Sequence, residues 1–192
     1  IPIWKISGLF KRIKSKEDLE NFIQERSAHV SQTTLYGYLK TRIGVKYIAM
    51  MEDEVFLKSI NIAKWNIYVV ALADCAFYVF SYLISEKNLK ENDCKEIFLN
   101  ILENEKKNGL SDEIFDRGKK NFLERLDKVN FSNYHLNDPF KESGQALYYW
   151  SPIADELKSL DKKIVLNSIH LKWGLMKDCL LYTSDAADDG VG

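Results

Sequence analysis

The stretch FLKSINIAKWNIYVVALADCAFYVFSYLI, from Phe56 to Ile84, decides the fold of this chain. It contains neither proline nor glycine, and Asp74 is its only charged residue after Lys64. A helix that is apolar on nearly all sides usually lies buried among other helices. The stretch therefore predicts a buried central helix, which we expect to span about residues 54–85.

The two sides of this helix differ when its residues are placed at about 100° per residue. One side is apolar, and the other carries tyrosines with polar residues toward its N-terminal end: Leu57, Asn61, Lys64, Tyr68, Ala71, Cys75, Tyr78 and Tyr82. We expect this tyrosine seam to pack on another helix of the same domain, because a buried tyrosine needs a partner for its hydroxyl. A groove for a partner or ligand is one alternative. A membrane span over residues 67–84 is another, which Asp74 near its centre disfavours.

Helix signals recur along the rest of the chain. Helix starts are expected at Ser15, at Glu52 or Asp53, at Asn92 or Asp93, at Ser111 and at Ser151-Pro152. Gly44 is expected to end the first helix, and Gly37 to admit a close helix contact within it. The last helix is expected to bury Ile153, Leu157, Leu160, Ile164, Leu171 and Leu175. Because no strand-like alternation occurs, the predicted class is all-α, a single-domain bundle of five or six main helices around the buried central helix.

Both ends of the chain differ from its middle. Residues 1–14 mix apolar and basic side chains and are expected to form a lead-in arm, with the N-terminus truncated. Residues 179–192 resemble the translation of a sequencing-library adapter and are expected to be a non-native tail. The single helical domain would then be residues 15–178. Without the three acids of that tail the net charge changes from −1 to +2, and neither value predicts a nucleic-acid partner.

The remaining cysteines, Cys75 and Cys94, form no C-x-x-C pair. Reduced thiols of this kind are typical of a cytosol-like compartment. We therefore expect a cytoplasmic protein without a transmembrane span, with membrane association as an alternative.

Signatures of common enzymes and metal sites are missing from the sequence. It has no G-x-S-x-G, no G-x-x-x-x-G-K and no paired Glu-x-x-His repeat, and its three histidines join no cysteine cluster. Ser143-Gly144 is expected to lie in a loop, with one or two helical turns from Ser143 to Trp150 as the alternative. We therefore predict no catalytic, cofactor-binding or metal-binding residues, and we expect that the protein is not an enzyme.

Asp74 is the residue whose surroundings need explanation. A carboxylate in an apolar helix must be paired, hydrogen-bonded or protonated. Its possible partners are Arg42, Lys64 and Arg26, and we expect Arg42, because a guanidinium can hold a carboxylate through two hydrogen bonds. A buried pair that fixes helix register is the first interpretation, and a catalytic carboxylate is the alternative. The candidate polar cluster comprises Tyr36, Tyr38, Arg42, Lys64, Tyr68, Asp74 and Tyr78.

Four short blocks within about residues 30–130 resemble the ubiquinol–cytochrome c chaperone family. They are Leu35-Tyr36-Gly37 with Arg42, Phe56 with Ile60, Gly109-Leu110-Ser111-Asp112, and Gly118-Lys119. The resemblance implies an all-helical assembly factor that binds a respiratory-complex subunit and catalyses nothing. The C-terminal third is more similar to uncharacterised bacterial helical proteins.

The expected function is therefore binding of another protein, in the manner of an assembly or chaperone-like factor, with a membrane-complex subunit as one such partner. The tyrosine seam, or the aromatics Tyr148-Tyr149-Trp150 and Trp173, would supply the contact, because large rigid rings dominate interface energetics. The alternative is a small-molecule enzyme or ligand-binding protein, with a pocket around Tyr36, Arg42, Lys64 and Asp74.

Overall fold

The computed structural model describes the backbone of residues 13–185 and the side chains of residues 13–180. No strand occurs in this part of the chain. Its helices are α1 (Lys16–Ile43), the short α2 (Tyr47–Met50), α3 (Glu54–Ser85), α4 (Glu91–Lys107), α5 (Asp112–Leu126), α6 (Lys141–Trp150) and α7 (Asp155–Asp185), with 3-10 turns η3 (Gly44–Lys46) and η4 (Tyr134–Leu136). The predicted all-α class is confirmed. The lead-in arm lies outside the described residues except for Ile13, which packs against the core, and Lys14.

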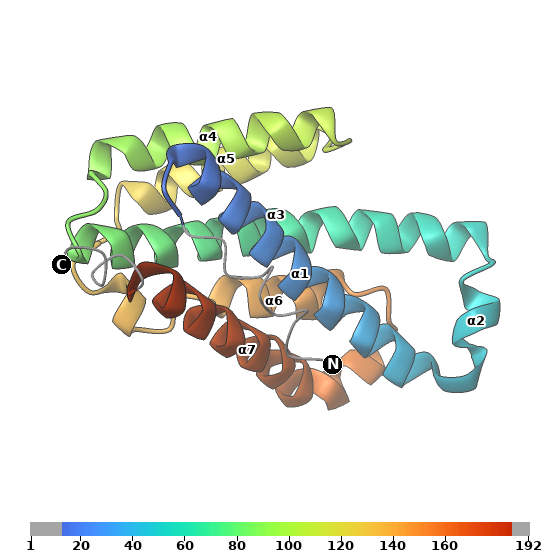
Figure 1. Ribbon diagram of the computed structural model, residues 1–192. Coiled ribbons are helices and arrows are strands. Elements are labelled where there is room, and N and C mark those ends of the chain that lie inside the picture. Colours follow the sequence, from blue (N-terminus) through green and yellow to red (C-terminus); the bar gives the residue numbers. More distant parts are fainter. Residues whose placement is uncertain (1–12, 186–192) are drawn as a thin grey trace.

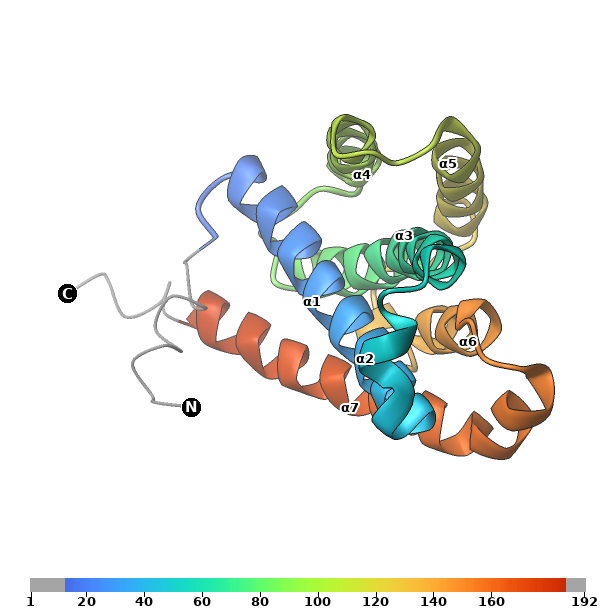
Figure 2. The same cartoon turned by 90° about the vertical axis from the view of Figure 1, so that its right-hand side faces the viewer.

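Helix α3 runs through the middle of the bundle (Figure 1). The α4–α5 pair covers one side of α3, and α1 and α6 cover the other (Figure 2). Helix α7 packs on α1 and α6 and is therefore the outer helix of its side. Within the described residues, α3 is the one helix long and apolar enough to cross a membrane, and 83% of its most apolar 18-residue window is buried by the rest of the protein.

The predicted helix starts are confirmed at three positions. Ser15, Asp53 and Ser111 each accept a hydrogen bond from the backbone N–H three residues on. Helix α4 instead follows Lys90, whose side chain makes no capping bond, so the expected cap at Asn92 or Asp93 is wrong.

The expected start of the last helix at Ser151-Pro152 is also wrong, because α7 begins at Asp155. The Ser151 hydroxyl donates back to the Leu147 carbonyl, 2.6 Å away, and so closes α6. Helix α7 instead starts from Ala154, whose carbonyl accepts the backbone N–H of Lys158 at 3.0 Å. Ser143 and Gly144 lie inside α6, so the expected loop is wrong and the alternative, one or two helical turns from Ser143 to Trp150, is confirmed.

Glycine admits a close helix contact at Gly118, where α5 meets α3. A Cβ built on Gly118 would overlap the Val69 side chain, whereas a Cβ on Gly37 would meet nothing within 4 Å. The expected close contact at Gly37 is therefore wrong. At Gly44, φ is 62°, which explains why a glycine ends α1.

We expect Gly118→Ala and Gly37→Ala to change the free energy of unfolding in opposite directions. Gly118→Ala forces α5 away from α3 and should destabilise the protein by about 1–3 kcal/mol. Gly37→Ala should stabilise it by about 0.5–1 kcal/mol, because alanine lowers the entropy of the unfolded chain. Urea unfolding measures both values. A double variant, Gly118→Ala with Val69→Ala, should recover part of the loss, and a cost unchanged by Val69→Ala would contradict the overlap.

Helix α7 buries the opposite stripe from the one predicted. Val165, Ile169, Trp173, Met176 and Leu180 face the core. Of the six expected core residues, Ile153 lies before α7 and packs partly buried against the core, whereas the other five are exposed to 42% at Leu157, 74% at Leu160, 67% at Ile164, 70% at Leu171 and 58% at Leu175. Helix α7 carries two apolar stripes, and as an outer helix it can bury only one. The buried stripe is the one that contains Trp173, the side chain with the largest apolar area to remove from water.

Candidate functional site

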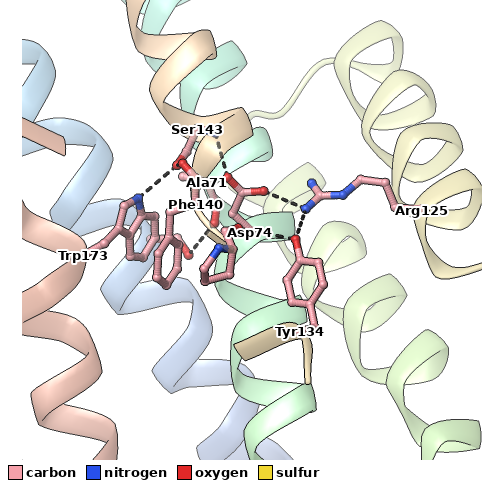
Figure 3. A network of polar contacts seen from close by, with 9 residues as sticks. Ala71, Asp74, Arg125, Tyr134, Phe140, Ser143 and Trp173 are labelled. Atoms are coloured by element: carbon pink, nitrogen blue, oxygen red, sulfur yellow. Dashed lines mark hydrogen bonds and ion pairs between the residues drawn. The ribbon is translucent and has the colours of Figure 1, made fainter. Parts of the chain in front are cut away.

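Asp74 is fully buried in α3 and binds Arg125 of α5, not Arg42 as predicted (Figure 3). The Arg125 Nη2 donates to Asp74 Oδ1 at 2.8 Å and to the Tyr134 hydroxyl at 2.9 Å. The second carboxylate oxygen, Oδ2, accepts the backbone N–H of Ser143 at 2.7 Å. Both oxygens of Asp74 are therefore engaged by groups far away in the sequence.

The same carboxylate stabilises the start of α6. Phe140, the residue before α6, makes no capping bond with its side chain. The buried negative charge of Asp74 lies instead at the N-terminal end of the helix dipole, on the N–H of Ser143. The Ser143 hydroxyl donates to the Phe140 carbonyl at 2.9 Å and accepts from Trp173 Nε1 at 2.9 Å. This network joins α3, α5, α6 and α7, and its role is to hold these helices together.

Burial raises the pKa of Asp74 from its ordinary value of 3.8 to about 6, while Arg125 and the Ser143 N–H oppose the rise. The folded protein therefore holds this proton more tightly than the unfolded chain. The stabilisation from Asp74 is complete below pH 3.8 and is lost as the pH rises through about 6.

The pH dependence of the free energy of unfolding, compared between the wild-type protein and Asp74→Asn, tests the raised pKa of Asp74. A difference of about 2 between the folded and unfolded pKa values corresponds to about 3 kcal/mol. We expect the wild-type protein to gain up to that amount over Asp74→Asn as the pH falls from neutral to below the unfolded pKa. Urea unfolding of both proteins across this range gives the difference, in which the other carboxylates cancel. A difference that stays flat or falls would contradict the raised pKa.

Arg42 and Tyr38 bind a different carboxylate, Asp161 of α7. Arg42 contacts both oxygens of Asp161, through Nε at 2.8 Å and Nη2 at 2.9 Å. The Tyr38 hydroxyl donates to Asp161 Oδ2 at 3.0 Å, and burial together with this carboxylate raises the pKa of Tyr38 to about 12. These contacts attach α7 to α1. Tyr36 packs half-buried against the core.

The other predicted cluster residues lie in two further places. The Tyr68 hydroxyl donates to the buried Glu105 at 2.7 Å, and burial raises the pKa of Tyr68. Lys64 lies over the Trp65 ring at 5.1 Å. The Tyr78 ring packs on Phe140, with 5.2 Å between centroids. The seven residues do not form one cluster, and the predicted pocket around Arg42 and Asp74 is wrong because these two side chains bind different partners.

A groove of about 440 Å³ lies beside the Asp74 network, between α3, α5 and α6. We call it the α3–α5 groove. It is lined by Asn66, Val69, Val70, Ala73, Ile114, Arg117, Gly118, Asn121, Glu124, Arg125, Lys128, Tyr134, Asp138, Pro139, Lys141, Glu142 and Trp150. Sequence reasoning missed this groove, since its lining comes from α3, α5 and α6, which are far apart in the sequence.

The five exposed apolar residues of α7 form the second candidate site, which we call the α7 face: Leu157, Leu160, Ile164, Leu171 and Leu175. Their spacings of three, four, seven and four residues place them on one side of the helix and keep part of a heptad pattern, with exposed Asn167 in the seven-residue gap. Of the predicted interface aromatics, Tyr149 is exposed and Trp173 is fully buried, so Trp173 cannot contact a partner.

A serine and a histidine come together at Ser81 and His135, a pair that sequence reasoning missed. The Ser81 Oγ lies 2.8 Å from His135 Nδ1, but it is fully buried and donates to the Phe131 carbonyl at 2.6 Å. A hydroxyl whose proton is already engaged and which no substrate can reach is not a nucleophile. Between residues 13 and 180, no group of three or more His, Cys, Asp or Glu side chains gathers in a way that could hold a metal ion.

No protein-family model, curated protein or solved structure matches this chain. Among the described residues, the α7 face and the α3–α5 groove are the features from which a function is inferred below.

Proposed function

We propose that this protein acts without catalysis, by docking a helix of another protein on the α7 face. The observation that carries the proposal is the exposure of five leucine and isoleucine side chains along one side of a helix. Single exposed apolar residues are ordinary, but a contiguous apolar patch on a protein surface typically marks an interaction site. The core is complete without these five, because α7 already buries the stripe through Trp173.

The spacing of the α7 face indicates a helical partner. Residues three and four apart lie on one side of a helix, and a repeat of seven keeps that side in register with a second helix. From Leu157 to Leu175 the face spans 18 residue steps, or about 27 Å at 1.5 Å per residue. An amphipathic helix of about five turns, with leucine-like residues at the same spacing, would cover it.

The chemistry of the partner follows from that geometry. Its docking side would be apolar, and its edges would be mixed in charge, because exposed Glu156, Lys163 and His170 border the α7 face. The resemblance to the ubiquinol–cytochrome c chaperone family extends the proposal to an assembly factor whose partner is a subunit of a membrane complex. A cytoplasmic location beside a membrane would suit that role.

Site-specific photo-crosslinking in the cells that produce the protein tests the proposal. A crosslinker at Leu157 should give a covalent adduct with one other protein, identified by mass spectrometry. A crosslinker at exposed Ser159 is the matched control, because Ser159 lies on α7 about 140° around the helix from Ile164. Adding Ile164→Glu should lower the Leu157 adduct at least about tenfold, since it places a charge in an apolar contact.

The unfolding midpoint of Ile164→Glu should stay within a few degrees of the wild-type value, because substitutions at exposed sites rarely change stability by more than about 0.5 kcal/mol. Equal adducts at Leu157 and Ser159 would contradict docking on the α7 face. Adducts with residues 1–12 of the same chain, or with a second copy, would show that the face has another occupant, and would equally overturn the proposal.

A further inference from the structure

We propose that the α3–α5 groove binds a small aromatic carboxylate, with the carboxylate on Arg117 and the ring beside Trp150. This inference does not rest on the α7 face. The groove's volume of about 440 Å³ falls within the range of about 300–1,000 Å³ typical of small-molecule sites.

The two arginines of the groove differ in whether a buried carboxylate neutralises their charge. Arg125 has the buried Asp74 as its counterion at 2.8 Å. Arg117 donates to the side-chain oxygen of Asn66, a neutral amide, and its guanidinium lies 5.5 Å from the centre of the Trp150 ring. Its carboxylate neighbour, Glu113, is 3.7 Å away and 86% exposed, so this pair is weak. Arg117 therefore keeps a positive charge and hydrogen-bond donors for an anion.

The orientation of Arg117 is set before any ligand arrives. Asn66 is 4% exposed, and its amide nitrogen donates to the Ile62 carbonyl at 2.8 Å, which fixes the oxygen that faces Arg117. A guanidinium held between an anchored amide and an aromatic ring loses little entropy when it binds an anion. Preorganisation of this kind increases affinity without further contacts.

The remaining lining determines the class of anion. Val69, Val70 and Ala73 of α3 give the groove an apolar wall, and the indole of Trp150, which lies against Arg117, adds aromatic area that a ligand ring can contact. Four basic and three acidic side chains line the groove: Arg117, Arg125, Lys128 and Lys141 against Glu124, Asp138 and Glu142. This near balance favours a singly charged carboxylate over a doubly charged phosphate.

Titration of the whole protein with naphthalene-2-carboxylate tests the inference, with the indole N–H signal of Trp150 in an NMR spectrum as the readout. Trp150→Phe assigns the signal. We expect a saturable shift with a dissociation constant at or below the millimolar range. Naphthalene-2-carboxamide, which has the same shape without the charge, should bind about tenfold or more weakly, because hydrogen bonds to charged groups are the stronger ones.

Arg117→Gln should weaken binding of the carboxylate by a similar factor, and Lys120→Gln, an exposed change on α5 outside the groove, should leave it unchanged. The comparison of acid and amide on the wild-type protein holds even if Arg117→Gln fails to fold. Ile164→Glu should also bind normally, which separates this test from that of the α7 face. No saturable shift, equal binding of acid and amide, or tighter binding of 2-naphthyl phosphate would each overturn the inference.

Discussion

Asp74→Ala is expected to lower the free energy of unfolding by about 3–5 kcal/mol, a large part of the stability of a single domain. The substitution leaves Arg125, whose side chain is 27% exposed, without its counterion. It also leaves the Ser143 N–H buried without its acceptor, at the start of a helix that has no other side-chain cap. Asp74→Asn should cost less, because its amide keeps an acceptor oxygen and the shape of the protonated acid.

Urea unfolding followed by circular dichroism measures the loss, with Asp116→Ala as the control. Asp116 is an exposed aspartate of α5, and its removal should change stability by no more than about 0.5 kcal/mol. Arg125→Ala completes a double-mutant cycle with Asp74→Ala. Because the two side chains bind each other, the double variant should lose clearly less than the sum of the single losses. Additive losses would show that the pair contributes nothing as a pair.

Trp173→Ala is expected to cost about 3–5 kcal/mol, comparable to the loss at Asp74. Trp173 is fully buried, and its ring stacks on Phe140 with 4.4 Å between centroids and 8° between planes. Its Nε1 donates to the Ser143 hydroxyl, so the same side chain supports the start of α6. Removal leaves a cavity the size of an indole between α6 and α7.

Trp173→Phe separates packing from hydrogen bonding. It keeps an aromatic ring beside Phe140 and loses the bond to Ser143, so it should cost roughly 1–2 kcal/mol. Leu171→Ala, two residues away on α7 and 70% exposed, should stay within about 0.5 kcal/mol of wild type. Equal losses for Leu171→Ala and Trp173→Ala would mean that α7 buries the stripe that the sequence predicted and not the one through Trp173.

The stretch from Phe56 to Ile84 shows what could be predicted from the sequence of this chain. Its apolar composition predicted a central helix over about residues 54–85, and the structure places α3 at Glu54–Ser85. The prediction succeeded because composition over many residues and a local cap, here Asp53, are properties of the sequence alone.

The partner of Asp74, in contrast, could not be predicted from the sequence. The need for a partner could be predicted from burial, but the expected partner Arg42 is wrong, and Arg125, 51 residues away in the sequence, was not among the candidates. Several cations were equally available in the sequence. Only the packing of α5 against α3, which Gly118 permits, decides which of them reaches Asp74.

The amino-acid sequence by itself determines the all-α class, the extent of α3 and the helix caps at Ser15, Asp53 and Ser111. These depend on composition along the chain and on neighbours within about four residues. The tertiary structure alone decided the partner of Asp74, the α3–α5 groove and the stripe of α7 that faces water. The physical reason is that an outer helix with two apolar stripes can bury only one of them, and the pairing of charges depends on which helices meet.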